Sequence, residues 1–254
     1  MTDASPGTAV SRSSPQPRSV RPLPEAVVFD CDGTIADTES ISDRAWTATL
    51  AEFGYTPTPA DFKRVIGHPF PQNWAYFSSR VDLGDRDDFR AGLRARFLDL
   101  FDRELACYPD AVATIRELGR AGVPMAVASS SSRAHVQRVL ERAEVVNQIT
   151  AIVGADDVER HKPHPDPYLD AAAALGVAPT RCSAVEDTPV GVTAAVEAGM
   201  FTVAVVRAHG NAVDLSAAHR VVVDVSVDAL LATSPDPDVH PDSEDEASRS
   251  RSGR

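Results

Sequence analysis

Short, continuous apolar runs recur along the middle of this chain. They lie at residues 26–29, 124–128, 149–153, 183–185, 202–206 and 221–223. An uninterrupted apolar run of this length is typical of a strand that is buried on both faces. Between most of these runs, apolar residues recur at helical spacing, as at Ile115 and Leu118 or at Val136, Val139 and Leu140. Strands that alternate with helices predict a parallel sheet covered on both faces.

The segment between the first and second runs breaks this alternation. Residues 37–107 contain no convincing strand and instead show two helical patterns, at 40–53 and 86–105. Gly54 is placed to stop the first of these helices. We therefore expect an α/β fold, a doubly wound, Rossmann-like parallel sheet with a small α-helical cap domain inserted after the first strand. The predicted core comprises residues 23–36 and 108–232, and the predicted cap comprises residues 37–107.

The two ends of the chain differ in composition from its middle. Residues 1–22 are rich in serine and proline, and residues 233–254 are polar and charged. Neither end has enough apolar side chains to offset the entropy lost on ordering, so we expect both tails to be disordered.

Charge and composition narrow the class of protein. The formal net charge of -12 argues against sequence-independent binding of nucleic acid, which requires a basic surface. Cys31, Cys107 and Cys182 have no disulfide or zinc spacing, which fits reduced thiols. No apolar run is long enough to span a membrane, and the N-terminal residues lack the apolar core of a signal peptide. We expect a cytoplasmic protein with no nucleic-acid or membrane partner.

Candidate chemistry is concentrated where predicted strands end. Asp30 and Asp32 follow the first strand in a turn that contains Gly33. A serine run, 129–132, follows the second strand, and the adjacent pair Glu186 and Asp187 follows a later one. Ligands of open α/β sheets bind at such strand ends. Each motif also has a structural reading, because serine and aspartate commonly cap the helix that follows.

Lysine is rare in this chain. Lys63 and Lys162 are its only two lysines, and Lys162 lies in the proline-rich segment 161–167. A compact ammonium group binds phosphoryl oxygens as a point charge, a role that a planar guanidinium does not reproduce.

These four motifs, in the order in which they occur along the chain, resemble those of the haloacid dehalogenase-like superfamily of aspartyl-phosphate phosphotransferases. The resemblance covers roughly residues 25–225. It implies that Asp30 is the nucleophile and that Asp32 is the general acid and base, for which a raised pKa is expected. It also implies phosphate binding by Ser129, Ser130 and Lys162. The implied cofactor is Mg²⁺, and the implied ligands are Asp30, the Asp32 backbone carbonyl, Asp187, and Glu186 directly or through water.

The predicted cap resembles that of the β-phosphoglucomutase-like group, which contains both sugar phosphatases and mutases. Ser42 stands where the mutases of that group have a histidine, and the loop 65–70 supplies neither their lysine nor their arginine. We therefore expect hydrolysis of a small phosphate monoester of the sugar or polyol phosphate class. Glu39, Arg44 and His68 are candidates for contact with this small phosphorylated metabolite.

Two alternatives stay open: a sugar-phosphate mutase, and a non-catalytic metal-binding regulatory protein. The sequence does not identify the substrate. A monomer is favoured, because the cap itself would cover the site.

Overall fold

A computed structural model describes residues 23–65, 70–207 and 213–231. The two predicted tails, His68 and residue 232 lie outside these ranges. Within them, six parallel strands form one sheet in the order β3-β2-β1-β4-β5-β6. The strands are β1 (Ala26–Phe29), β2 (Met125–Ala128), β3 (Ala151–Val153), β4 (Cys182–Glu186), β5 (Phe201–Val205) and β6 (Arg220–Val222). Each predicted apolar run coincides with a strand to within two residues at either end, so the predicted fold class is confirmed.

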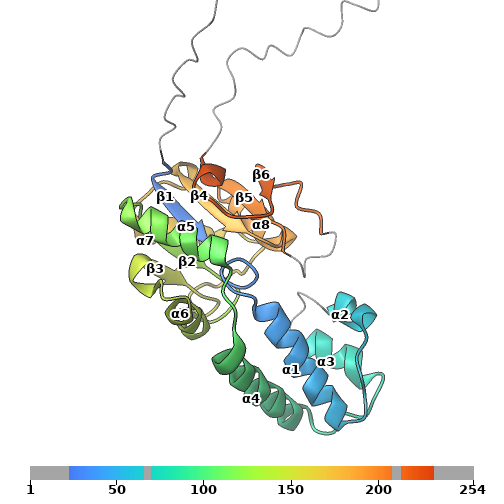
Figure 1. Cartoon of the computed structure of the whole chain (residues 1–254). Coiled ribbons are helices and arrows are strands. Elements are labelled where there is room, and N and C mark those ends of the chain that lie inside the picture. Colours follow the sequence, from blue (N-terminus) through green and yellow to red (C-terminus); the bar gives the residue numbers. More distant parts are fainter. Residues whose placement is uncertain (1–22, 66–69, 208–212, 232–254) are drawn as a thin grey trace, which may run out of the picture.

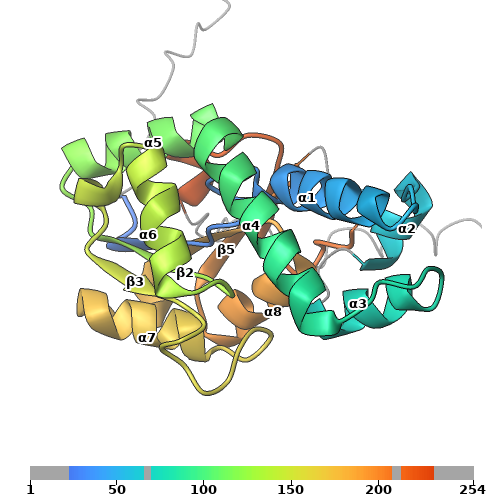
Figure 2. The ribbon, with the colours of Figure 1, turned by 90° about the horizontal axis from the view of Figure 1, so that it is seen from below.

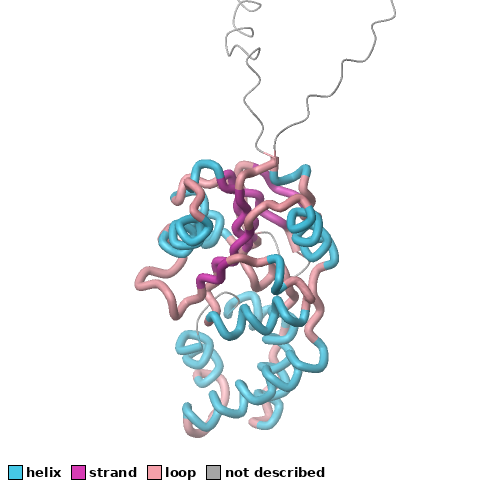
Figure 3. The backbone as a smooth tube through the Cα atoms, turned by 90° about the vertical axis from the view of Figure 1, so that its left-hand side faces the viewer, coloured by secondary structure: helices cyan, strands magenta, loops and turns pink. Residues whose placement is uncertain are grey.

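Helices cover both faces of the sheet, which Figure 3 shows nearly edge-on. Phe29 and Val127 pack on one face against α5 (Pro109–Arg120) and α6 (Arg133–Arg142). Val28 and Ala126 pack on the other face against α7 (Asp166–Leu175) and α8 (Pro189–Glu197). Successive strand residues point to opposite faces, so a fully apolar strand can supply two separate cores.

Of the five helices that the structure describes between β1 and β2, the first four form the insertion and α5 packs on the sheet. These four are α1 (Thr38–Glu52), α2 (Pro59–Val65), α3 (Phe70–Ser78) and α4 (Arg86–Glu104), and they extend away from the sheet on one side (Figure 1). They share an apolar cluster of their own, in which Trp46 contacts the rings of Phe77 and Phe89. This insertion therefore has its own hydrophobic core, although its boundaries at residues 37 and 107 stay a prediction.

Two linkers join the insertion to the sheet, and they are hydrogen-bonded to each other. Ala36 and Cys107 form an antiparallel bridge, and Asp37 N–H donates to the Ala106 carbonyl at 2.9 Å. Seen from below, α4 crosses in front of the carboxyl ends of the strands, with α1 beside it (Figure 2). The insertion is thus held over the edge of the sheet at which β1 and β4 end.

Candidate active site

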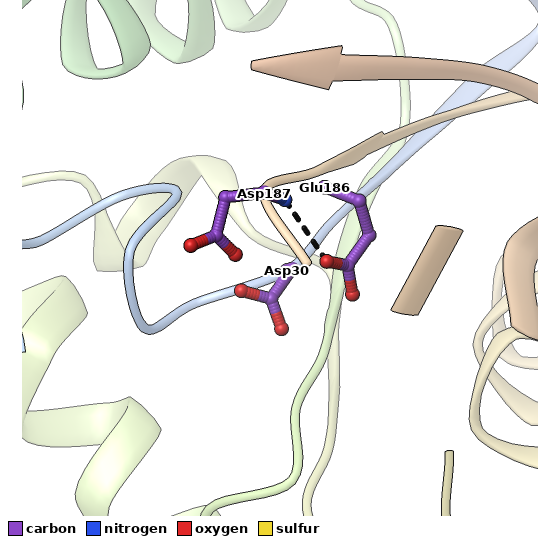
Figure 4. Close-up of side chains that lie close together, drawn as sticks. All are labelled: Asp30, Glu186 and Asp187. Carbon is purple, nitrogen blue, oxygen red and sulfur yellow. Dashed lines mark hydrogen bonds between the residues drawn. The ribbon is translucent and has the colours of Figure 1, made fainter. Parts of the chain in front are cut away.

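Three carboxylates meet at the carboxyl ends of β1 and β4. Asp30 directly follows β1, and its backbone N–H donates to the Val185 carbonyl of β4 at 2.8 Å. Asp30, Glu186 and Asp187 each offer an oxygen within 4.8 Å of the others, and their side chains converge in Figure 4. Because β1 and β4 are neighbours in the sheet, residues 156 positions apart in the sequence come into one cluster.

Lys162 reaches into this cluster from the loop before α7. Its ammonium nitrogen lies 2.6 Å from Asp30 Oδ1 and 2.6 Å from Glu186 Oε1, and its side chain is almost completely buried. One positive charge therefore bridges two of the three carboxylates. Burial lowers the pKa of Lys162, but the charges of Asp30 and Glu186 outweigh burial and hold it well above its usual value.

Glu186 is fully buried, and both of its oxygens accept several hydrogen bonds. Oε1 accepts from Lys162 and from the hydroxyl of Tyr168 at 2.9 Å, while Oε2 accepts from Asp187 N–H and from Thr188. Gly191 lies so close that a Cβ there would sit 1.6 Å from Oε1. Burial raises the pKa of Glu186, but Lys162 and the hydrogen bonds outweigh burial and lower it. Glu186 therefore holds Lys162 and the β4–α8 turn in place.

Asp187 differs from its neighbour because one of its carboxylate oxygens receives no hydrogen bond from the described residues. This oxygen, Oδ1, is buried. Burial, followed by the charges of Asp30 and Glu186, raises the pKa of Asp187 well above its usual value. A buried carboxylate oxygen without a partner is costly unless a cation or a proton satisfies it. The donor set consists of hard oxygens, which suits Mg²⁺.

Asp30 shows the same shortage of positive charge. Burial raises its pKa to about 7, against the opposing effect of Lys162 and with further increases from Glu186 and Asp32. A bound divalent cation would stabilise the ionised forms of Asp30 and Asp187, since an opposite charge favours the charged state of a carboxyl group. The residues present therefore fit a metal ion.

Asp32 lies beside the cluster and is surrounded by hydrogen-bond donors. Its Oδ1 accepts from the hydroxyl of Thr38 at 2.8 Å and lies 2.8 Å from Nε2 of His135. Its Oδ2 accepts from the hydroxyls of Ser131 at 2.7 Å and Ser129 at 3.3 Å. These partners come from α1, from the loop after β2, and from α6.

The expected rise in the pKa of Asp32 is wrong for this arrangement. Burial raises the pKa, but hydrogen bonding and charge from His135, together with the hydroxyls of Ser131 and Thr38, lower it to about 2. Hydrogen bonds to an ionised carboxylate favour that form. The sequence showed the carboxylate and the serine run after the second strand, but not that these serines, Thr38 and His135 converge on Asp32.

The other candidate residues lie in different surroundings. Ser130 is exposed, and its neighbour Ser131 makes the contact with Asp32. Arg44 forms a half-exposed ion pair with Glu104 at 2.6 Å. Glu39 is close enough for burial and the charge of Asp32 to raise its pKa to about 7. His68 is outside the described residues.

Four functional candidates escaped the sequence analysis. Thr38 and His135 bind Asp32, Tyr168 binds Glu186, and Thr188 both binds Glu186 and caps α8. Tyr168 carried a usable signal, because the family motif that the segment around Lys162 resembles commonly has a Phe or Tyr six residues after its lysine, where Tyr168 stands. For His135 there was none, since helical spacing gave no reason to connect it with Asp32.

A pocket of about 250 Å³ opens between α1 and α4. Its lining combines aromatic and apolar walls with three polar side chains, and comprises Ser42, Ala45, Trp46, Phe70, Arg90, Leu93, Arg94 and Phe97. Two of its lining residues are neighbours of the partners of Asp32: Ser42 is one helical turn beyond Thr38, and Phe97 contacts the ring of His135. Among the described residues, no helix is long and apolar enough to cross a membrane.

Comparison with known proteins gives consistent matches. The profile of a family described as haloacid dehalogenase-like hydrolase matches residues 27–205. Fructose-1-phosphate phosphatase YqaB of Escherichia coli is 30% identical over 185 residues, which are 70% of this chain and 94% of that protein. Hexitol phosphatase A of the same organism is 30% identical over 179 residues, covering 70% of this chain and 81% of that protein.

A solved structure agrees with these matches. CbbY of Rhodobacter sphaeroides, in complex with phosphate, superposes with a TM-score of 0.70 at 27% identity. The superposition covers 82% of this chain and 99% of that one. The likeness thus extends over the sheet and the helical insertion together.

Proposed function

The chain belongs to the haloacid dehalogenase-like hydrolase family and is a phosphatase, and on that premise we propose that it hydrolyses a small sugar or polyol phosphate through an aspartyl-phosphate on Asp30. The observation that carries the proposal is the buried cluster of Asp30, Lys162, Glu186 and Asp187 at the ends of β1 and β4. Burying several charges costs free energy and adds little to stability. Such a cluster is therefore typical of a site that binds a charged group.

In the first step, a carboxylate oxygen of Asp30 attacks phosphorus and the bond to the leaving oxygen breaks. Asp32 gives its proton to that oxygen, so the product leaves as an alcohol. Lys162 and Ser129 stabilise charge on the transferring phosphoryl group. Catalysis rests on positioning and charge, because phosphoryl transfer requires little other chemistry from the protein.

In the second step, Asp32 removes a proton from a water molecule that attacks the same phosphorus, and the bond to Asp30 breaks. Inorganic phosphate leaves, and Asp30 returns to a free carboxylate. Asp32 must therefore carry a proton in one half of the cycle only. It is ionised in the described arrangement, so taking up the proton requires its hydrogen bonds to rearrange.

Asp30, Asp187 and the Asp32 backbone carbonyl would hold Mg²⁺. Bound there, the ion would supply charge that a phosphoryl group needs and that Lys162 alone does not provide. Both oxygens of Glu186 already accept hydrogen bonds. Glu186 would therefore affect the metal indirectly, by fixing the position of Asp187, whose N–H donates to Glu186 Oε2 at 2.9 Å.

The pocket between α1 and α4 supports a small leaving group. A volume of about 250 Å³ suits a sugar or polyol better than a large substrate. Ser42, Arg90 and Arg94 supply hydrogen-bond donors, and the largely buried Trp46 forms part of the apolar wall. The names of two relatives, a fructose-1-phosphate phosphatase and a hexitol phosphatase, agree with this class.

The proposal is tested by release of inorganic phosphate from a panel of hexose, hexitol and other small phosphate esters, with Mg²⁺ and with EDTA. We expect release that requires the metal and disappears in Asp30→Asn. Asp170→Asn, an exposed carboxylate of α7, is the matched control and should leave the rate unchanged. Release that persists in Asp30→Asn would rule out Asp30 as the nucleophile.

The same panel separates the two alternatives. It includes β-glucose 1-phosphate with a bisphosphate activator, and its conversion without phosphate release would identify a mutase. Failure of the wild-type protein to turn over any ester would favour the metal-binding regulatory protein.

A further inference from the structure

Among the four donors to Asp32, His135 is unlike the other three. Thr38, Ser129 and Ser131 offer hydroxyls on short side chains, whereas His135 offers a planar ring with its Nε2 2.8 Å from Oδ1. A hydroxyl hydrogen rotates freely to suit its partner, but an imidazole nitrogen has one fixed direction. The orientation of the His135 ring therefore determines which orientation of the Asp32 carboxylate can form this hydrogen bond.

The ring of His135 is itself held from the cap side. Its centroid lies 5.4 Å from the ring of Phe101 and 6.0 Å from that of Phe97, both on α4. Its backbone is fixed by the first turn of α6, where its N–H donates to the Ser132 carbonyl at 2.9 Å. Arg138, one turn further along α6, also lies over the Phe101 ring and pairs with Asp102. His135 thus sits in a joint between α6 of the sheet domain and α4 of the insertion.

We infer that His135 is a positioning residue. Its hydrogen bond fixes the orientation of the Asp32 carboxylate, and its ring contacts with Phe97 and Phe101 make that orientation depend on the position of α4. The inference rests on the role proposed above for Asp32 and adds the residue that controls its orientation. A movement of α4 relative to α6 changes the position of the His135 ring, and with it the hydrogen bond to Asp32 Oδ1. The orientation of Asp32, the proposed general acid and base, therefore depends on the position of the cap relative to the substrate.

A comparison of leaving groups tests this inference. An alkyl phosphate from the substrate panel needs a proton on its leaving oxygen, whereas 4-nitrophenyl phosphate releases a stable phenolate that does not. The ratio kcat/KM reports the steps up to the transfer onto Asp30, so it isolates the step in which Asp32 acts as an acid. Because general acid catalysis contributes about 10²–10⁴-fold, we expect His135→Ala to lower kcat/KM for the alkyl ester roughly 10–100-fold. The value for 4-nitrophenyl phosphate should stay nearly unchanged.

Two further variants sharpen the result. His135→Gln places an amide N–H at the reach of the imidazole Nε2 and should recover most of the alkyl-ester activity. His219→Ala is the matched control, because His219 also packs on an aromatic ring, at 5.3 Å from that of Phe201, and accepts from Thr202 N–H at 3.0 Å. Its loss should leave the ratio of alkyl to aryl activity as in the wild type.

The double variant with Asp32→Asn separates this inference from the proposed function. Asp32→Asn alone must lower the alkyl-ester value selectively; if it does not, the role of Asp32 fails and the inference with it. If it does, adding His135→Ala should cause no further loss, because His135 acts through Asp32. Equal losses on both esters in His135→Ala, or a full additional loss in the double variant, would overturn the inference alone.

Discussion

Gly33 is the residue at which backbone and chemistry constrain each other most tightly. Its φ is +82°, and a Cβ there would lie 2.0 Å from Asp187 Oδ2. Gly54, after α1, has a similar φ of +75° but nothing within 4 Å of the position of a Cβ. The two glycines therefore separate backbone strain from displacement of the metal-site carboxylate.

We expect Gly33→Ala to lower phosphate release by about two orders of magnitude, because a displacement of about 1 Å at a catalytic group can cost that much. Gly54→Ala should keep full activity and lose only about 1 kcal/mol of stability, the strain of a left-handed alanine. Phosphate release and urea unfolding measure the two effects. Comparable activity in both variants would contradict the role assigned to Asp187.

The residues that the sequence identified are those in which a motif states the chemistry directly. Asp30 and Asp32 come after β1, Glu186 and Asp187 lie at the end of β4, and the topology of a parallel sheet brings these strand ends together. Lys162 reaches them from the loop between β3 and α7. Their individual roles stay a prediction. His135 could not be found in this way, because its contact with Asp32 depends on where the first turn of α6 meets α4. Helical periodicity shows which face of α6 is apolar but not which loop that helix faces.

At the scale of single elements, α2 illustrates how a short helix is stabilised. Asp61, in its first turn, accepts from the N–H and the hydroxyl of Thr58, each at 2.7 Å, and from the hydroxyl of Tyr76 on α3 at 2.7 Å. Thr58 and Asp61 thus cap the start of the helix, and Tyr76 joins it to α3. Hydrogen bonds from Thr58 and Tyr76 lower the pKa of Asp61 to about 2.

A depressed folded-state pKa contributes stability that is present above the unfolded value of about 3.9 and is lost as pH falls toward 2. We expect Asp61→Asn to lower the free energy of unfolding by about 1–2 kcal/mol at pH 7. The difference from the wild type should shrink between pH 4 and pH 2. Urea unfolding over this range measures it, with Tyr76→Phe, which removes one donor, as a milder comparison. A difference that is constant with pH would refute the assignment.

The pattern of apolar residues predicted the strands and the two long cap helices but did not resolve α2 and α3. These helices have seven and nine residues, too short to show a periodic stripe clearly. Their apolar residues include Phe62, Phe70 and Trp74, which are only partly buried around the cap cluster. Their stability comes from that tertiary packing and from contacts such as the one at Asp61, which no local pattern reveals.

At the scale of the whole molecule, the site and the fold make opposite demands. The sheet brings Asp30, Glu186 and Asp187 together. Burial and mutual repulsion make the ionised cluster unfavourable, and the single positive charge of Lys162 offsets only part of this. A folded-state pKa raised above its unfolded value means that the carboxyl group destabilises the fold increasingly as pH rises above about 4. At pH 7 the metal-free protein therefore has a strained centre, which a cation would relieve.

This balance predicts how Asp187→Asn should behave. The variant removes one buried charge, so in EDTA at pH 7 its thermal midpoint should equal or exceed that of the wild type. Mg²⁺ should raise the midpoint of the wild type, because a ligand that binds only the folded state stabilises it, and should leave the variant unchanged. Asp170→Asn, exposed on α7, should respond to Mg²⁺ as the wild type does. Equal stabilisation of all three proteins by Mg²⁺ would place the ion elsewhere, while a large loss of stability in the metal-free variant would make Asp187 a structural residue.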